Sequence, residues 1–185
     1  VKRNLNMDLK DYSSINLDWA KSINENKKIN EPLNPKILKQ YIPLPHKLWI
    51  EEGIDAYTQK FFKICYNLEF NQIVIPIYNK DDKLIGVKAR NLDTNKYEAK
   101  YIYLYKCSAS NNLFGLNIAK RHMEKTNQLI IFEGEKSVMK AFAFGYRNTV
   151  ALGCKDLTLS QLGLLKEYIN KDTKISYALL ASNKK

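Results

Sequence analysis

The hydrophobic pattern changes along the chain and separates a strand-rich stretch from one in which strands and helices alternate. Between residues 72 and 106, three segments carry apolar runs or alternate with a period of two, which is typical of β-strands: residues 72–78, 83–91 and 96–106. Residues 79–82, NKDD, predict a turn between the first two strands. Pro76 favours an edge position for the first strand, because proline has no N–H to donate.

Short helices are predicted before this strand-rich stretch. Asn34 and Pro35 form a good helix start, with asparagine as the N-cap and proline in the first turn, and we expect this helix to reach about residue 41. Residues 46–52 predict another helical turn. Asp55 predicts the cap of a helix over residues 56–64.

The pattern after residue 128 is different. Residues 129–132 are apolar and predict a short buried strand, after which apolar residues recur at helical spacing. Residues 149–152 and 174–180 predict two further strands. Thr158 and Gln161 predict a capping box at the start of the helix between them.

These patterns predict an α+β or α/β chain in two parts. Residues 34–116 are expected to form a small mixed subdomain of helices and antiparallel sheet. Residues 117–185 are expected to form part of a parallel-sheet α/β subdomain. The polar residues 1–33, rich in Lys and Asn, are interpreted as a linker or arm.

Composition favours a soluble globular protein with a polyanionic partner. Hydrophobic residues make up 45% of the 185 residues and charged residues 26%. Thirty Lys and Arg against 19 acids give a formal net charge of +11, and nucleic acid is the leading candidate partner. A lysine-rich proteome is the alternative explanation of this charge.

The cysteine spacing and the apolar segments indicate the expected cellular location. The three cysteines lie far apart with no Cys-x-x-Cys or Cys/His spacing, so we expect no zinc site and a reducing compartment. No signal peptide or apolar span long enough for a membrane is present. The expected location is cytoplasmic.

Two candidate sites follow from the pattern. Glu133 ends the strand of residues 129–132, and in an open α/β sheet chemistry collects at the carboxyl ends of strands; a solvated glutamate in a turn is the alternative. Alternation also predicts one basic sheet face suited to a phosphate backbone, with tyrosines such as Tyr101 on the other face. Two alternative interpretations remain open: the tyrosines are packing residues, and the charged face is only solvated surface. The residues of the predicted basic face are Lys88, Arg90, Lys100 and Lys106.

The sequence EGEKS at residues 133–137 resembles the first motif of the toprim domain in DnaG-type primases, particularly phage-type members. Residues 150–153, Thr158 and Gln161 resemble the segment that follows it. The resemblance extends upstream to the basic subdomain of bacterial-type primases and covers roughly residues 44–180. Its upstream parts are residues 49–62, 73–78, 84–90, 100–101 and 113–116.

The resemblance implies a fragment of a primase core, which synthesises RNA primers on single-stranded DNA from ribonucleoside triphosphates. Glu133 would be a catalytic acid, either a ligand of Mg²⁺ (or Mn²⁺) or a proton acceptor. Arg90, Lys100 and Tyr101 match family positions that hold template or incoming nucleotide. Contact with a replicative helicase would require regions outside this chain.

The sequence departs from the family at one important point. The family's Asp-x-Asp pair should follow the strand of residues 174–180, where this chain has Ala181, Ser182 and Asn183. An incomplete or inactive fragment of a primase is the favoured explanation, and an error in the predicted strand register is the other. A further acidic cluster is expected beyond Lys185, so the toprim subdomain is expected to be truncated.

Two other functions remain open. One is a catalytically inactive toprim-containing module that binds single-stranded nucleic acid, which Ala181 and Asn183 favour. The other is a toprim nuclease or topoisomerase, against which the resemblance upstream of residue 117 argues.

Overall fold

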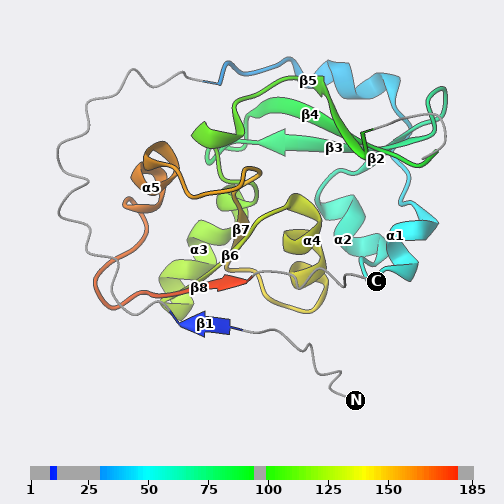
Figure 1. Ribbon diagram of the computed structural model, residues 1–185. Coiled ribbons are helices and arrows are strands. Elements are labelled where there is room, and N and C mark those ends of the chain that lie inside the picture. Colours follow the sequence, from blue (N-terminus) through cyan, green and yellow to red (C-terminus); the bar gives the residue numbers. More distant parts are fainter. Residues whose placement is uncertain (1–8, 12–29, 94–98, 179–185) are drawn as a thin grey trace.

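Two four-stranded sheets form the framework of the computed structural model, which describes residues 9–11, 30–93 and 99–178 (Figure 1). The first sheet is antiparallel throughout, in the order β2-β3-β4-β5. Its strands are β2 (Cys65–Asn67), β3 (Gln72–Tyr78), β4 (Leu84–Asn91) and β5 (Tyr101–Tyr105). The predicted antiparallel subdomain is therefore confirmed.

The second sheet has the order β1-β8-β6-β7, and its central strand β6 is parallel to both β7 and β8. Its strands are β1 (Leu9–Asp11), β6 (Gln128–Phe132), β7 (Thr149–Ala151) and β8 (Lys174–Ala178). This confirms the predicted parallel α/β part. Strand β1 pairs antiparallel with β8 and lies within the segment predicted as a linker or arm, so that prediction missed a strand.

Three of the helical segments begin where their capping residues predict. The side chains of Asn34, Asp55 and Thr158 each accept a hydrogen bond from a backbone N–H of the helix that follows. The first of these helices is a 3₁₀ helix. The helical segments are η2 (Pro35–Gln40), α1 (Lys47–Glu51), α2 (Ala56–Phe61), η3 (Ala109–Asn111), α3 (Leu116–Thr126), α4 (Glu135–Ala143) and α5 (Leu159–Leu165).

Helix α3 was not predicted, although its sequence carries a signal. It buries Leu116, Ala119 and Met123, which recur at helical spacing, between charged residues. Gly115 precedes it with φ 85°, in the left-handed region that glycine adopts without strain. Because most residues of this helix are polar or charged, its hydrophobic periodicity is a weak signal in the sequence.

Pro76 was predicted to mark an edge strand, and this is wrong for β3 as a whole because β2 and β4 flank it. Strand β2, however, pairs only with Gln72, Ile73 and Val74. From Ile75 onward the registered partner of β3 lies in β4. Pro76 thus lies in the part of β3 that has no partner in β2, where its missing N–H is tolerated.

The two sheets share one hydrophobic core. Ile73, Ile75 and Ile77 on the inner face of β3 belong to the same buried cluster as Phe132 of β6 and Met139 of α4. A second cluster on the other face of the parallel sheet joins alternate residues of β6 to α3 and α5. The parallel sheet therefore lies between a layer of α3 and α5 and a layer that contains α4 and the antiparallel sheet (Figure 1).

Gln161 ties the junction of these layers together. Its side chain is fully buried, and Nε2 donates to the carbonyl oxygens of Ala109, Asn112 and Leu152 at 2.8–3.0 Å. Its Oε1 accepts from the N–H of Thr158, which completes the predicted capping box. One amide thus fixes η3, the end of β7 and the start of α5 at the same place.

Within the residues that the structure describes, no helix has the length and apolar character needed to cross a membrane.

We predict that Gly86→Ala lowers the free energy of unfolding by about 1–3 kcal/mol, because overpacking a closed site is destabilising. A Cβ at residue 86 would lie 2.6 Å from Sγ of Cys107. Gly134→Ala is the matched control, since a Cβ there meets nothing within 4 Å; because Gly134 is the N-cap of α4, this change should cost about 0.5–1 kcal/mol through the weaker capping preference of alanine alone. Urea unfolding measures both. A Gly86→Ala protein as stable as the Gly134→Ala protein would show that Cys107 does not close this site.

Candidate functional site

A cleft of about 530 Å³ opens at the carboxyl ends of β6, β7 and β8, where the antiparallel sheet approaches α4. We call it the cleft from here on. It joins residues that lie far apart in the sequence but meet in the fold. Its lining residues are Lys88, Lys100, Tyr101, Glu133, Gly134, Glu135, Lys136, Ser137, Gly153, Cys154, Lys155 and Ala178.

Glu133 lies in the cleft, as its position after β6 predicts. Its side chain is exposed, and its carbonyl oxygen accepts a 2.8 Å hydrogen bond from the N–H of Gly153. Gly153 has φ 65°, which places it in the left-handed region and allows the chain to turn beside the carboxylate of Glu135. The loops after β6 and β7 are thereby fixed together, with the Glu133 carboxylate open to solvent.

Lys88 and Glu135 form a buried ion pair across the cleft. Nζ of Lys88 lies 2.9 and 3.1 Å from the two carboxylate oxygens of Glu135, and the side chains are 15% and 7% exposed. Glu135 also occupies the first turn of α4, where a negative charge is favourable. The Glu135 side chain is buried because β4 brings a lysine over the start of α4.

A second group of charges lies beside this pair. Glu52 follows α1 and accepts hydrogen bonds from the Arg90 guanidinium at 3.2 and 3.4 Å, while Nζ of Lys136 lies 2.5 Å from the same carboxylate. Burial acts to raise the pKa of Glu52, but the hydrogen bonds and charges of Lys136 and Arg90 outweigh it and hold the pKa below its usual value. Glu52 was not singled out from the sequence.

The pKa of Lys136 is lowered. Burial is the main cause, and the nearby charges of Arg90 and Lys100 add to it, while Glu52 acts in the opposite direction. Lys136 therefore lies in a crowded group of cations that depends on Glu52 for its charge balance.

The predicted faces of the antiparallel sheet need correction. Arg90 pairs with Tyr101 and Lys88 pairs with Tyr103, so these tyrosines share the face of Lys88 and Arg90 instead of the opposite one. Nζ of Lys88 lies 5.4 and 5.5 Å from the two ring centroids. Burial is the main cause of the raised pKa of both tyrosines, which keeps their hydroxyls neutral.

Lys100 and Lys106 fall outside β5, because this strand is shorter than predicted. Alternation along the strand therefore does not determine on which face of the sheet they lie. Lys100 precedes the strand and lines the cleft. Lys106 follows it, is exposed, and is not part of the cleft lining. The predicted set of four cations is thus reduced in the cleft to Lys88 and Lys100, with Arg90 beside them.

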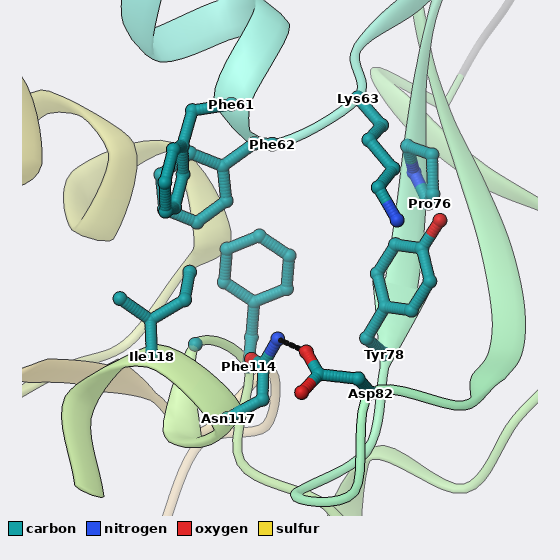
Figure 2. A pocket seen from close by; sticks show the side chains of 10 residues that line it. Phe61, Phe62, Lys63, Pro76, Tyr78, Asp82, Phe114, Asn117 and Ile118 are labelled. Carbon is teal, nitrogen blue, oxygen red and sulfur yellow. Dashed lines mark hydrogen bonds between the residues drawn. The ribbon is translucent and has the colours of Figure 1, made fainter. Parts of the chain in front are cut away.

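A smaller hollow of about 220 Å³ lies between α2, β3 and the start of α3. Figure 2 shows Phe61, Phe62 and Phe114 along one side and Tyr78 with Lys63 on the other. Its polar groups already contact one another: Asn117 donates to Asp82 at 2.7 Å, and Nζ of Lys63 lies 4.5 Å from the Tyr78 ring centroid. This hollow is lined mainly by aromatic and apolar side chains and offers few charged groups to a phosphate. We therefore take the cleft as the candidate functional site.

Known proteins resemble this chain over most of its length. No protein-family model matches. The SPbeta prophage-derived uncharacterized protein YorJ of Bacillus subtilis is 32% identical over 177 residues, covering 84% of this chain and 47% of YorJ. A DNA primase of Helicobacter pylori strain J99 is 33% identical over 121 residues, covering 64% of this chain and 21% of the primase. The chain thus spans about half the length of YorJ and about a fifth of that primase.

A DnaG primase catalytic domain solved with single-stranded DNA has the same fold. The TM-score is 0.59, over 72% of this chain and 56% of that domain, with 19% sequence identity. This likeness shows the fold. In sequence the chain is similar to bacterial DNA primases, and its fold is that of a DnaG catalytic domain. The resemblance stated from residues 133–137 and the upstream segments is therefore confirmed.

The resemblance leads us to expect a divalent-metal site at Glu133. Among the described residues, no three His, Cys, Asp or Glu side chains are grouped so that they could hold a metal ion. Glu135 is engaged by Lys88, and Ala181 and Asn183 lie outside the described residues. Mg²⁺ often takes one or two protein carboxylates and completes its shell with water and substrate oxygens, so Glu133 fits as a single ligand.

We predict that Lys88→Met lowers the free energy of unfolding by about 3 kcal/mol, because it leaves the Glu135 carboxylate buried without its partner. The double variant Lys88→Met with Glu135→Leu should recover most of this loss, since neither charge then remains buried. Urea unfolding of the two variants and the wild type measures the difference. Equal stability of Lys88→Met and the wild type would mean that Glu135 is solvated.

Proposed function

We propose that the chain is the nucleic-acid-binding and nucleotide-binding core of a primase, a DNA-directed RNA polymerase that makes RNA primers on single-stranded DNA. The observation that carries this proposal is the cleft itself, which places the Glu133 carboxylate beside Lys88, Lys100 and Tyr101. A nucleotidyl transfer requires cations to bind phosphates and an acid to hold a metal or accept a proton. Homology to DNA primases supports the same chemistry. The likeness to YorJ supports a phage-type member.

The cations of the cleft have separate roles in this proposal. Lys100, which lines the cleft, binds phosphates of the template or the incoming nucleotide, and Arg90 and Lys88 extend this basic strip along β4. Tyr101 provides a half-buried ring beside them, on which a base can stack. Lys106 lies outside the cleft lining and is left out of this contact set. The DnaG domain of the same fold that was solved with single-stranded DNA supports this ligand.

We predict that Arg90→Ala and Lys100→Ala each weaken binding of a single-stranded oligothymidine about threefold to tenfold and flatten the salt dependence by up to about 0.7 in log–log slope. Each change removes one phosphate contact and its counterion release. Fluorescence anisotropy across a salt series measures both quantities. Lys125→Ala is the matched control, because Lys125 is exposed in the last turn of α3, at the opposite end of β6 from the cleft. Loss of affinity equal to that of Lys125→Ala would contradict the proposed contacts.

A divalent cation, Mg²⁺ or Mn²⁺, is the proposed cofactor, and Glu133 is its proposed ligand in this chain. When bound, the cation would supply positive charge to the attacking and leaving oxygens of the transferred phosphoryl group. Glu133 is suited to this because it is exposed at the end of β6 and its backbone is fixed to Gly153. Its neighbour Glu135 is unsuited while it holds Lys88.

We predict that Glu133→Gln abolishes specific Mn²⁺ binding in paramagnetic resonance, because the change removes the carboxylate charge and keeps the shape of the side chain. Asp156→Asn is the matched control. Asp156 is an exposed acid in the loop after β7 and is not part of the cleft lining. Unchanged Mn²⁺ binding in Glu133→Gln would remove this residue from the ligand set.

The second candidate is a binding module without catalysis. The neutral Ala181 and Asn183 at the Asp-x-Asp positions favour it, because neither supplies a carboxylate to a cation. The two candidates share the nucleic-acid contacts and differ in chemistry alone. Template-dependent incorporation of ribonucleotides, lost in Glu133→Gln, would exclude the binding module.

A further inference from the structure

Two of the three cations in the proposed basic strip, Lys88 and Arg90, are already bound to carboxylates. Lys88 holds Glu135, and Arg90 together with Lys136 holds Glu52. A guanidinium that donates two hydrogen bonds to a carboxylate presents the same donors that it would present to a phosphate. Any phosphate that binds Arg90 through these donors must therefore replace the Glu52 carboxylate.

The two carboxylates differ in how easily they can leave. The Glu135 side chain is 7% exposed and lies in the first turn of α4, so moving it would leave Lys88 buried and unpaired. The Glu52 side chain is 30% exposed, whereas its partner Arg90 is 11% exposed. Glu52 thus forms the solvent side of its pair and can turn outward while Arg90 stays in place.

The positive charges around Glu52 favour replacement of its carboxylate by another anion and disfavour its removal without a replacement. Burial is the main cause of the lowered pKa of Lys136, and the charges of Arg90 and Lys100 are close enough to add to it. Removal of Glu52 alone would leave this group without compensation, which is costly in a half-buried site. A phosphate group carries the missing negative charge and accepts the same hydrogen bonds.

We propose that Glu52 occupies a phosphate-binding position between Arg90 and Lys136, and that it swings out when a phosphate of single-stranded DNA or of a nucleotide takes its place. This inference rests on the proposed function for the identity of the ligand. It adds Glu52 and Lys136 to the binding residues and assigns them different roles. Lys136 contacts the phosphate, Glu52 competes with it, and the Lys88–Glu135 pair stays closed.

The test compares Glu52→Gln with Glu51→Gln. Both changes add one positive charge to the protein, but Glu51 is 59% exposed and pairs with Lys47 on the surface of α1. We expect Glu52→Gln to bind an oligothymidine about threefold to tenfold more tightly than Glu51→Gln, because the phosphate no longer has to displace a carboxylate from Arg90 and Lys136. Inorganic tripolyphosphate is the second probe, and a gain confined to it would identify a nucleotide triphosphate as the source.

The outcomes separate this inference from the proposed function. If the wild type binds the oligonucleotide and Glu52→Gln binds it no better than Glu51→Gln, the exchange is overturned and the proposed function stands. If neither probe binds the wild type or any variant, both fail.

A measurement on the wild type keeps the test valid if Glu52→Gln folds poorly. The ¹³C signal of the Glu52 carboxyl group is followed over a pH series without and with tripolyphosphate. Release from Arg90 and Lys136 should return the pKa of Glu52 toward its usual value, since these two residues cause its lowering. A pKa that stays lowered with the probe bound would overturn the exchange.

Discussion

The contact between the antiparallel sheet and α4 is the constraint on which the rest of the structure depends. Ile73, Ile75 and Ile77 bury one face of β3 in the same apolar cluster as Met139 of α4, and this shared core joins the two parts. It also fixes where polar residues meet. The start of α4 is held against β4, so the charges that border the core at this point must find partners in each other.

Buried charge explains why the EGEKS segment does more than supply one acid. An unpaired ammonium or carboxylate at the rim of the core would be costly, and a pair is retained only with good geometry. Glu135 and Lys136 are successive residues of α4. Glu135 forms an ion pair with Lys88, while Lys136 and Arg90 both pair with the carboxylate of Glu52. Glu133, by contrast, lies before the helix and remains exposed. One short segment thus joins the sheets and leaves one carboxylate open to the cleft.

The sequence predicted the parts governed by local rules. Capping residues located η2, α2 and α5, and alternation located β3 and β4, because these signals act over a few residues. The position of Glu133 followed from the carboxyl-end rule for parallel strands. The pairing of Lys88 and Tyr103 was missed because a register shift in β4 and a later start of β5 override alternation. Glu52 was missed because nothing local relates α1 to β4, 38 residues away.

These pairings change how the net charge of +11 should be understood. Bulk positive charge attracts any polyanion and does not distinguish one site from another. Lys88 in the cleft and Arg90 beside it are each matched by a carboxylate, so these two cations add less to the local field than the composition suggests. A ligand gains at Arg90 only if its phosphate makes better contacts than Glu52 does. Unspecific attraction therefore comes from the surface lysines, and the proposed exchange at Glu52, beside the cleft, is the step at which anionic ligands would be distinguished.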